Sequence, residues 1–341
     1  MPQKEPDISE DPANEEIDAV YTWVDGADPL FIAEKKRFDM HCESDSAQDS
    51  SSDNRFRDSG ELLFSLRSIE KFAPWVRKIH IVTNGQVPAW LNTTCRRISL
   101  VNHKQIFSNP DCLPVFNSNA IELQIHRIPG LSRRFLYLND DIFLCRAIHR
   151  RDFIKSGSAQ YFFFDNIPLH SDCLHGKVHD RAYAYTQLAA RQLKPACSER
   201  RLPSHCPQLY DRQILSRLEE LFSEAFIETT SHRFRHSKDI VLRVLYSIYI
   251  LETSERDKGH GPKTLKWNSD EYMFLGLTTH LRSSFRWLAT AGLRQPGFLC
   301  INDDMEASGK SRIMSLFCRM LLRCLYPKPS RFENGRQRST W

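Results

Sequence analysis

The stretch RFLYLNDD, residues 134–141, is a short apolar run that ends in an asparagine and two aspartates. A run of this length bounded by polar residues is typical of a buried strand. Ligands of open α/β sheets bind at the carboxyl ends of strands, which is where Asp140 and Asp141 stand. We therefore expect this stretch to supply both a central strand and part of a functional site.

The segments around this strand alternate between strand and helix patterns. Residues 17–24, 78–83 and 161–164 are further short apolar runs, and the first leads into an acidic turn at Asp25. Helices are predicted from Asp58, which with Glu61 resembles a capping box, to the residue before Pro74, and at residues 117–127. The second half is mostly helical in pattern, with helices expected near residues 178–193, 210–222 and 239–251. This order predicts an α/β fold with a parallel sheet and a helical second half.

Composition and charge exclude several classes of protein. The chain has 341 residues, 47 of them basic and 42 acidic, for a net charge of +5. This excess is too small to indicate nucleic-acid binding, although it suits a phosphate-bearing substrate or an anionic membrane surface. No secretory signal and no stretch of about 20 apolar residues is visible. The ten cysteines include no close pair, so we expect reduced thiols in a cytoplasmic protein.

Two metal sites are conceivable from the residue types. Asp140 and Asp141 could hold Mg²⁺ or Mn²⁺, because hard cations prefer oxygen ligands, although an aspartate pair after a strand is also common in plain turns. His170, Cys173, His175 and His179 are crowded enough to suggest zinc, but their spacing fits the common zinc patterns poorly. The carboxylate site is the better prediction.

Four blocks of sequence resemble the Stealth family. IDAVYTWVDG begins at residue 17, and the long second block includes RFRD from residue 55, SLRSIEKFAPWVRKIHIVTNGQVPAWLN from 65, NAIE from 119 and HRIPGLSRRFLYLNDDIFL from 126. SHCP from residue 204, the pair at 211–212 and FRHSKD from 234 resemble the third block, and CINDD from 300 resembles the fourth. The family contains the sugar-phosphate transferases of bacterial capsule synthesis and of the enzyme that tags lysosomal proteins.

The resemblance implies a Rossmann-like, GT-A-like core that transfers a sugar-1-phosphate. The implied donor is a nucleotide sugar, expected to be a UDP-linked hexose or N-acetylhexosamine, and the acceptor is a saccharide hydroxyl. The product is a phosphodiester, as in capsular or exopolysaccharide synthesis, and a nucleoside monophosphate is released. Two alternatives remain open: a metal-dependent glycosyltransferase that attacks the anomeric carbon, and an inactive relative that docks at the membrane and organises an assembly.

The family blocks also point to individual site residues. His205 is the predicted general base, because imidazole titrates in the useful range, and His236 or Asp25 could share this role. Arg235 is a predicted phosphate clamp, because a guanidinium matches phosphate oxygens in a bidentate fork. The other predicted substrate-binding residues are Arg57, Asn84, Gly85, Asn119 and Arg127. The predicted metal ligands are Asp140, Asp141, Asp303 and Asp304.

The domain prediction has three parts. Residues 1–15 form a polar N-terminus, residues 16–305 form the catalytic domain with a low-complexity loop at 43–54, and residues 306–341 form a basic tail. In a helix over residues 311–326, one side gathers Arg312, Arg319 and Arg323, and another gathers Ile313, Phe317, Met320, Leu321 and Cys324. Such a helix could lie on the inner face of the cell membrane, or it could pack on the domain with its arginines in water.

Overall fold

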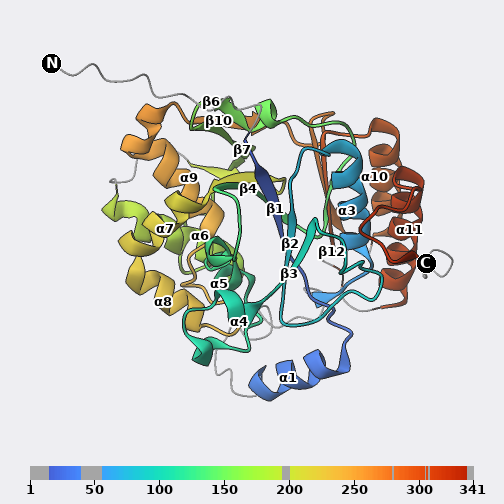
Figure 1. Cartoon of the computed structure of the whole chain (residues 1–341), viewed down its shortest axis with the longest axis horizontal. Coiled ribbons are helices and arrows are strands. Elements are labelled where there is room, and N and C mark those ends of the chain that lie inside the picture. Colours follow the sequence, from blue (N-terminus) through green and yellow to red (C-terminus); the bar gives the residue numbers. More distant parts are fainter. Residues whose placement is uncertain are drawn as a thin grey trace.

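A five-stranded sheet lies at the centre of the computed structural model, which describes residues 15–39, 56–193, 200–278, 280–303, 305 and 308–335 (Figure 1). Its strands, in the order β3-β2-β1-β4-β9, are β3 (Ile98–Asn102), β2 (Ile79–Thr83), β1 (Ile17–Thr22), β4 (Arg134–Asn139) and β9 (Gln208–Asp211). β1 to β4 run parallel to one another, and β9 runs antiparallel to β4. The predicted α/β fold with a parallel sheet is confirmed.

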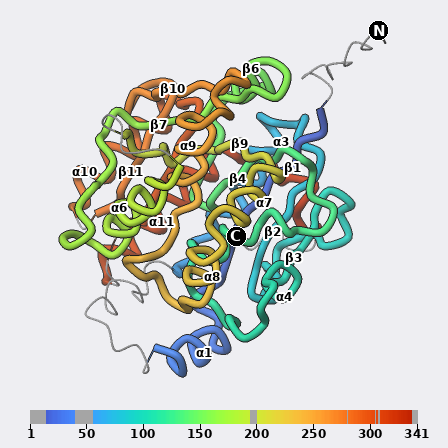
Figure 2. The backbone as a smooth tube through the Cα atoms, turned by 90° about the vertical axis from the view of Figure 1, so that its left-hand side faces the viewer, coloured from blue at the N-terminus to red at the C-terminus, as the bar shows by residue number. Residues whose placement is uncertain are grey.

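Helices cover both faces of this sheet because its strands are apolar on both sides. Along β1, Ile17, Ala19 and Tyr21 enter one hydrophobic core and Val20 enters another, as the alternation of a strand requires. The first core packs against α3 (Glu61–Phe72), α10 (Leu281–Arg294) and α11 (Gly309–Leu325). The second packs against α5 (Ser118–Glu122), α6 (Val178–Ala189), α7 (Arg212–Leu221), α8 (Ser223–Ser231) and α9 (Leu242–Glu252). Figure 2 views the molecule from the side of α6 to α9.

Two smaller sheets come mainly from the second half of the chain. One has the order β11-β12-β5, formed by β11 (Tyr272–Leu277), β12 (Phe298–Asp303) and β5 (Ile142–Leu144). The other joins β10 (Gly261–Leu265), β7 (Ala159–Pro168), β6 (Ile154–Ser156) and β8 (Arg201–Pro203). The three helices predicted in the second half are present as α6, α7 and α9, but the strands between them were not predicted.

Helix α3 begins differently from the prediction. Its N-cap is Gly60, which has a φ of 89°, and no side chain caps the helix. The Asp58 carboxylate accepts a hydrogen bond from the Gly60 amide at 2.7 Å, and Glu61 accepts one from the Ser59 amide at 2.6 Å. The predicted capping box is therefore wrong, because the N-cap is the left-handed Gly60, so that Asp58 lies in the turn ahead of the helix and Glu61 is its first residue.

The segment after residue 305 packs on the rest of the fold. Met314, Cys318 and Leu322 of α11 are buried in the first core, and so is Phe332 beyond the helix. Arg67 of α3 holds Glu333 in a two-pronged ion pair with nitrogen–oxygen distances of 2.8 and 2.6 Å. The predicted boundary after residue 305 therefore does not divide the packing. On the predicted apolar side of α11, Phe317 and Leu321 also pack against the first core, whereas Ile313 and Met320 are exposed.

Two further helices lie in the lower part of Figure 1. They are α1 (Pro29–Asp39) and α4 (His103–Ile106). Phe31 of α1 contacts Phe56 and Phe116, each at 5.4 Å between ring centroids. The predicted helix at 117–127 is α5 followed by a 3₁₀ turn, Ile125–Arg127. The predicted loop at residues 43–54 lies outside the described residues.

Candidate active site

A recess of about 410 Å³ opens beside the carboxyl ends of β1, β2 and β4. Thr22, Val82 and Asn139, at or near the ends of these strands, lie in its wall. Its lining also comes from α3, α5, α9 and β12, so segments far apart in the sequence meet there. Eight of the predicted site residues line it: Arg57, Asn84, Asn119, Asp140, Asp141, His205, Arg235 and Asp303.

Asp140 and Asp141 form the short turn between β4 and β5. These two strands belong to different sheets, so the turn joins the central sheet to the sheet β11-β12-β5. One oxygen of Asp141, Oδ2, accepts hydrogen bonds from Asn302 Nδ2 at 3.3 Å and from Cys300 Sγ at 3.4 Å. The other oxygen, Oδ1, is buried without a hydrogen-bond partner among the described residues.

Two further carboxylates, Asp58 and Glu61, lie close enough to act on this pair. Burial raises the pKa of Asp140 well above its usual value, and repulsion from Asp141, Glu61 and Asp58 raises it further. Burial also raises the pKa of Asp141, of Glu61 and of Asp58. A cation would relieve this crowding of acids, because opposite charge favours the ionised carboxylates.

The described carboxylates that line the recess do not by themselves form a complete set of metal ligands. No group of three or more histidine, cysteine, aspartate or glutamate side chains among the described residues is arranged to hold an ion. Asp303 forms an ion pair with Arg57, so the predicted metal ligand and the predicted phosphate clamp contact one another. Asp304 lies outside the described residues. The unpartnered Asp141 oxygen and the crowded carboxylates nevertheless fit an open divalent site that substrate oxygens would complete.

His205 also lines the recess. It follows β8, and its backbone amide donates a hydrogen bond to the Tyr272 hydroxyl at 3.1 Å, while its ring lies 5.4 Å from that of Phe274. Burial lowers the pKa of His205 well below its usual value, and the positive charges of Arg243 and Arg235 lower it further. The imidazole is therefore neutral near pH 7, as a proton acceptor must be.

The cationic side of the recess contains one predicted arginine and one that was missed. Arg235 donates two hydrogen bonds to Ser118 Oγ, at 2.7 and 3.2 Å. Arg243, near the start of α9, also lines the recess, together with Glu122 of α5. Burial raises the pKa of Glu122, whereas both arginines lower it. A single arginine near the start of an otherwise apolar helix was the sequence signal that could have identified Arg243.

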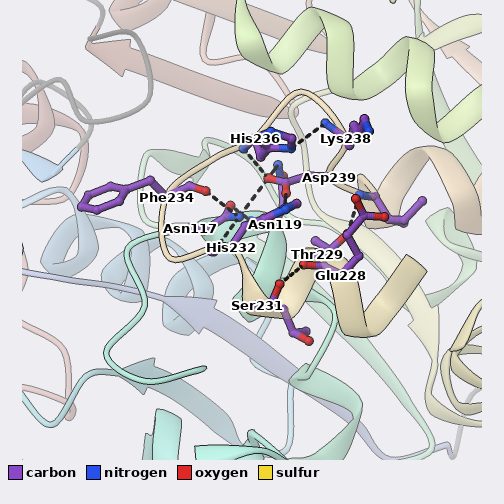
Figure 3. A network of polar contacts seen from close by, with 12 residues as sticks. Asn117, Asn119, Glu228, Thr229, Ser231, His232, Phe234, His236, Lys238 and Asp239 are labelled. Atoms are coloured by element: carbon purple, nitrogen blue, oxygen red, sulfur yellow. Dashed lines mark hydrogen bonds and ion pairs between the residues drawn. The ribbon is translucent and has the colours of Figure 1, made fainter. Parts of the chain in front are cut away.

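A buried network around Asp239 fixes the loop that carries Arg235 (Figure 3). Asp239 Oδ2 accepts hydrogen bonds from Asn117 Nδ2 at 2.9 Å, Asn119 Nδ2 at 3.1 Å and the His236 amide at 3.0 Å. Its Oδ1 bonds to His232 Nδ1 at 2.8 Å. The Asn119 amide nitrogen is therefore occupied by Asp239, so this residue positions α5 against the loop.

Four predicted site residues are absent from the lining of the recess. Asp25 shapes the turn after β1, where its carboxylate accepts from the Ala27 amide, and Gly85 is exposed beside Asn84. His236 is held at its amide by Asp239. Exposed Arg127 pairs with Glu219 at 2.8 Å, beside a different surface depression. These positions do not support the binding role predicted for Arg127.

The alternative zinc set is also engaged elsewhere. His170 Nε2 contacts the backbone carbonyls of Asp172 and His175 at 2.8 and 3.1 Å. His175 pairs with Asp172, while His179 contacts Arg243 at 3.3 Å. His170 and His175 thus share Asp172 as a partner, whereas His179 contacts Arg243.

Three conserved regions of Stealth proteins match this chain. Conserved region 1 matches residues 15–41, conserved region 2 matches residues 55–162 and conserved region 3 matches residues 204–252. The matches include the turn at Asp140 and Asp141, His205 and Arg235. They follow the order expected from the sequence.

Individual relatives agree with this assignment. An exopolysaccharide phosphotransferase of Streptomyces coelicolor is 35% identical over 93% of this chain and 52% of its own length. The capsular polysaccharide phosphotransferase WcwK of Streptococcus pneumoniae is 40% identical over 48% of this chain and 47% of its own. The chain thus spans about half the length of these relatives.

Among solved structures, the galactosyltransferase LgtC in complex with donor and acceptor sugar analogs aligns with a TM-score of 0.41 and 11% identity, over 90% of this chain and 95% of that chain. The family assignment rests on the sequence matches, which run in order from residue 15 to residue 252 and include recess residues from both halves of the chain. On these matches, the chain belongs to the Stealth family.

Proposed function

We propose that this chain is a catalytic core that transfers a sugar-1-phosphate from a nucleotide sugar to a saccharide hydroxyl. The observation that carries the proposal is that one recess brings together the carboxylates Asp140 and Asp141, the cations Arg235 and Arg243, and a neutral histidine, His205. The relatives named as exopolysaccharide and capsular polysaccharide phosphotransferases support it. The expected setting is synthesis of a capsule or exopolysaccharide.

The carboxylates that line the recess suit the nucleotide end of the donor. Asp140 and Asp141 would hold Mg²⁺ or Mn²⁺, which when bound supplies positive charge for the diphosphate oxygens. Asp303 is a weaker candidate ligand, because it already pairs with Arg57. Asn84 lines the same recess and offers an amide to the donor.

The arginines and the histidine that line the recess suit the reacting phosphate and the acceptor. His205 takes the proton of the acceptor hydroxyl as that oxygen forms a bond to the phosphorus next to the sugar. The bond from this phosphorus to the bridging diphosphate oxygen breaks, and the nucleoside monophosphate leaves. Arg235 offers hydrogen bonds to the phosphate oxygens as their charge changes.

Labelling of the donor identifies the bond that is cleaved. With radioactive phosphorus at the sugar-proximal phosphate, the label is expected in the saccharide product, and the released nucleotide is expected to be a monophosphate. The measurement is chromatography of the labelled saccharide and of the nucleotide released by the same reaction. A chain with His205→Ala serves as the control for contaminating activity.

The alternatives give different products in this experiment. Release of a nucleoside diphosphate with an unlabelled saccharide would establish the glycosyltransferase. A chain that turns over no nucleotide sugar from a broad panel, yet binds anionic membranes, would establish the inactive assembly protein.

We also propose that α11 holds the protein on an anionic membrane surface, the inner face of the cell membrane. Ile313, Leu316 and Met320 form a stripe along this helix and are 52, 61 and 53% exposed. Exposed Arg312 and Arg323 flank the stripe, a combination that suits acyl chains beside anionic headgroups. No helix among the described residues is long and apolar enough to cross a membrane.

The triple variant Ile313→Ser, Leu316→Ser and Met320→Ser is expected to bind vesicles at least about 10-fold more weakly, because three apolar side chains are lost. The vesicles contain equal parts of phosphatidylglycerol and phosphatidylcholine. Higher salt should weaken the original chain's binding as well. Co-sedimentation measures both effects, and Leu174→Ser with Ile227→Ser, exposed on other segments, is the matched control. Binding that is equal for all three chains would contradict the proposal. Removal of the whole segment is not a suitable test, because Met314 and Phe332 are core residues.

A further inference from the structure

Arg243 is a cation in the wall of the recess that has no carboxylate contact. α9 carries two charged residues, and the other, Glu252, is paired with Arg200 at 2.8 Å. The described contacts of Arg243 are with neutral groups: its Nη2 lies 2.6 Å from the Tyr183 hydroxyl and 3.3 Å from His179 Nε2. No ion pair joins Arg243 to a carboxylate within the described part of the chain. Charges in such sheltered positions are normally paired by direct contact, so the arrangement suits an anionic ligand at Arg243.

The geometry leaves most of the guanidinium available. A guanidinium has five N–H donors in a rigid fork, and the described hydrogen bonds of Arg243 use Nη2 alone. Its Nε and Nη1 have no acceptor among the described residues. The Tyr183 ring, whose centroid lies 5.6 Å from the guanidinium carbon, supports the group from α6. Arg243 is therefore held from one side and presents two adjacent nitrogens, the pattern that matches phosphate oxygens.

The surroundings place the anion next to His205. Arg243, Arg235 and His205 line the same recess, and both arginines lie close enough to His205 to lower its pKa; Lys177 is in the lining as well. Glu122 and Asp141 are also in the lining, and their carboxylates attract Arg243 without ion-pair contact. An anion bound to Arg243 would thus lie in the same recess as His205 and the carboxylates.

We propose that Arg243, held in place by Tyr183, is the principal binding group for the sugar-proximal phosphate of the donor. The inference rests on the proposed function for the identity of the ligand, but a phosphate site at Arg243 can be tested without turnover. Arg235 then contacts the same phosphate from the loop held by Asp239, and the metal site is left to the nucleotide-proximal phosphate.

Binding of inorganic pyrophosphate to the full chain without metal, measured by calorimetry, tests this assignment. Arg243→Gln is expected to weaken binding about 10–100-fold, the loss of hydrogen bonds to a charged group. Tyr183→Phe should weaken it about 3–10-fold, because one neutral hydrogen bond to the guanidinium is lost. Arg286→Gln, at an exposed position of α10, is the matched control and should bind as the original chain does.

A second measurement separates a local role from general damage to the fold. The charges that act on His205 are those of Arg243 and Arg235. Removing either positive charge should raise the pKa of the His205 imidazole, followed by NMR titration of the chain without substrate, whereas Arg286→Gln should leave it unchanged.

Pyrophosphate affinity equal to that of the original chain in folded Arg243→Gln would overturn the proposal. If Arg243→Gln does not fold, Tyr183→Phe decides, and an unchanged affinity in that variant overturns it. Loss of pyrophosphate binding in a chain that transfers no sugar phosphate with any donor would leave the phosphate site standing and refute the proposed function instead.

Discussion

His205→Ala is expected to lower sugar-phosphate transfer about 10²–10⁴-fold, the usual contribution of a general base, while donor binding stays close to that of the original chain. Turnover and donor binding are expected to respond differently because of where His205 lies. His205 lines the same recess as the carboxylates that would bind the metal and the nucleotide end but is not one of these ligands, so its loss removes a proton acceptor and leaves them in place. Turnover and calorimetric donor affinity, measured on the same preparation, test the split.

The matched control is His236→Ala. His236 belongs to the same family blocks but is absent from the lining of the recess, and its amide is held by Asp239. Its loss should cost much less than that of His205. Added imidazole should partly restore His205→Ala, since a small base can enter the vacated space. Turnover near the original rate in His205→Ala would show that the base lies elsewhere.

The pH dependence follows from the sign of the shift. Burial and two arginines lower the pKa of His205, so the fraction of neutral base falls only when the pH drops below the ordinary histidine range. The acidic limb of turnover should therefore lie at lower pH than for a solvent-exposed histidine. Bound phosphate carries negative charge and should move that limb upward in the enzyme–donor complex.

Asp141→Asn is expected to have opposite effects on activity and stability. Transfer should fall about 10²-fold or more, because a bound divalent ion supplies several kcal/mol of charge stabilisation. In EDTA, however, the melting temperature should rise by about 2–4 °C for each kcal/mol of repulsion relieved. The reason is that Asp141 Oδ1 has no partner among the described residues and that Asp140 is repelled by three neighbouring carboxylates.

The stability effect should depend on pH with a defined sign. Asp140 and Asp141 have raised pKa values in the folded chain, so ionising them costs stability as the pH rises through the unfolded value near 4. The gain from asparagine should be largest near neutral pH and absent well below pH 4. Thermal unfolding in EDTA across this range measures it, with Asp257→Asn, an exposed aspartate, as the control.

Metal provides the complementary test of the same residue. Mg²⁺ or Mn²⁺ should stabilise the original chain by mass action and should have little effect on Asp141→Asn. A variant that is less stable than the original in EDTA and still stabilised by metal would contradict the proposed ligand role.

Local patterns predicted the regular elements well. β1, β2, β4 and β7 are apolar runs with polar ends, and α3, α6, α7 and α9 have helical patterns that the structure confirms. The sequence position of Asp140 and Asp141 after β4 was enough to place them at the recess. His205 and Arg235 are different, because only the resemblance to a family marked them among many histidines and arginines.

What could not be predicted depends on contacts between distant parts of the chain. β5 has three residues and pairs with β12, and no local sequence pattern predicts so short a strand. Glu61 fitted a capping box, yet the N-cap is the left-handed Gly60, and burial of the Glu61 side chain, with repulsion from Asp58, raises its pKa. Of the predicted apolar side of α11, Phe317 and Leu321 pack against the first core whereas Ile313 and Met320 are exposed, because which part of the helix is covered depends on α3 and α10 rather than on the helix itself.

The pairing of β5 with β12 has a consequence for the order in which the chain acquires its structure during synthesis. β5 ends at Leu144, and its partner strand begins at Phe298. A ribosome that adds about 5–20 residues per second takes roughly 8–30 s to make the intervening chain. During that interval the central sheet can form, but the Asp140–Asp141 turn is anchored on one side only. We therefore expect the nascent domain to complete its core late, with β5 open to a chaperone until β12 emerges.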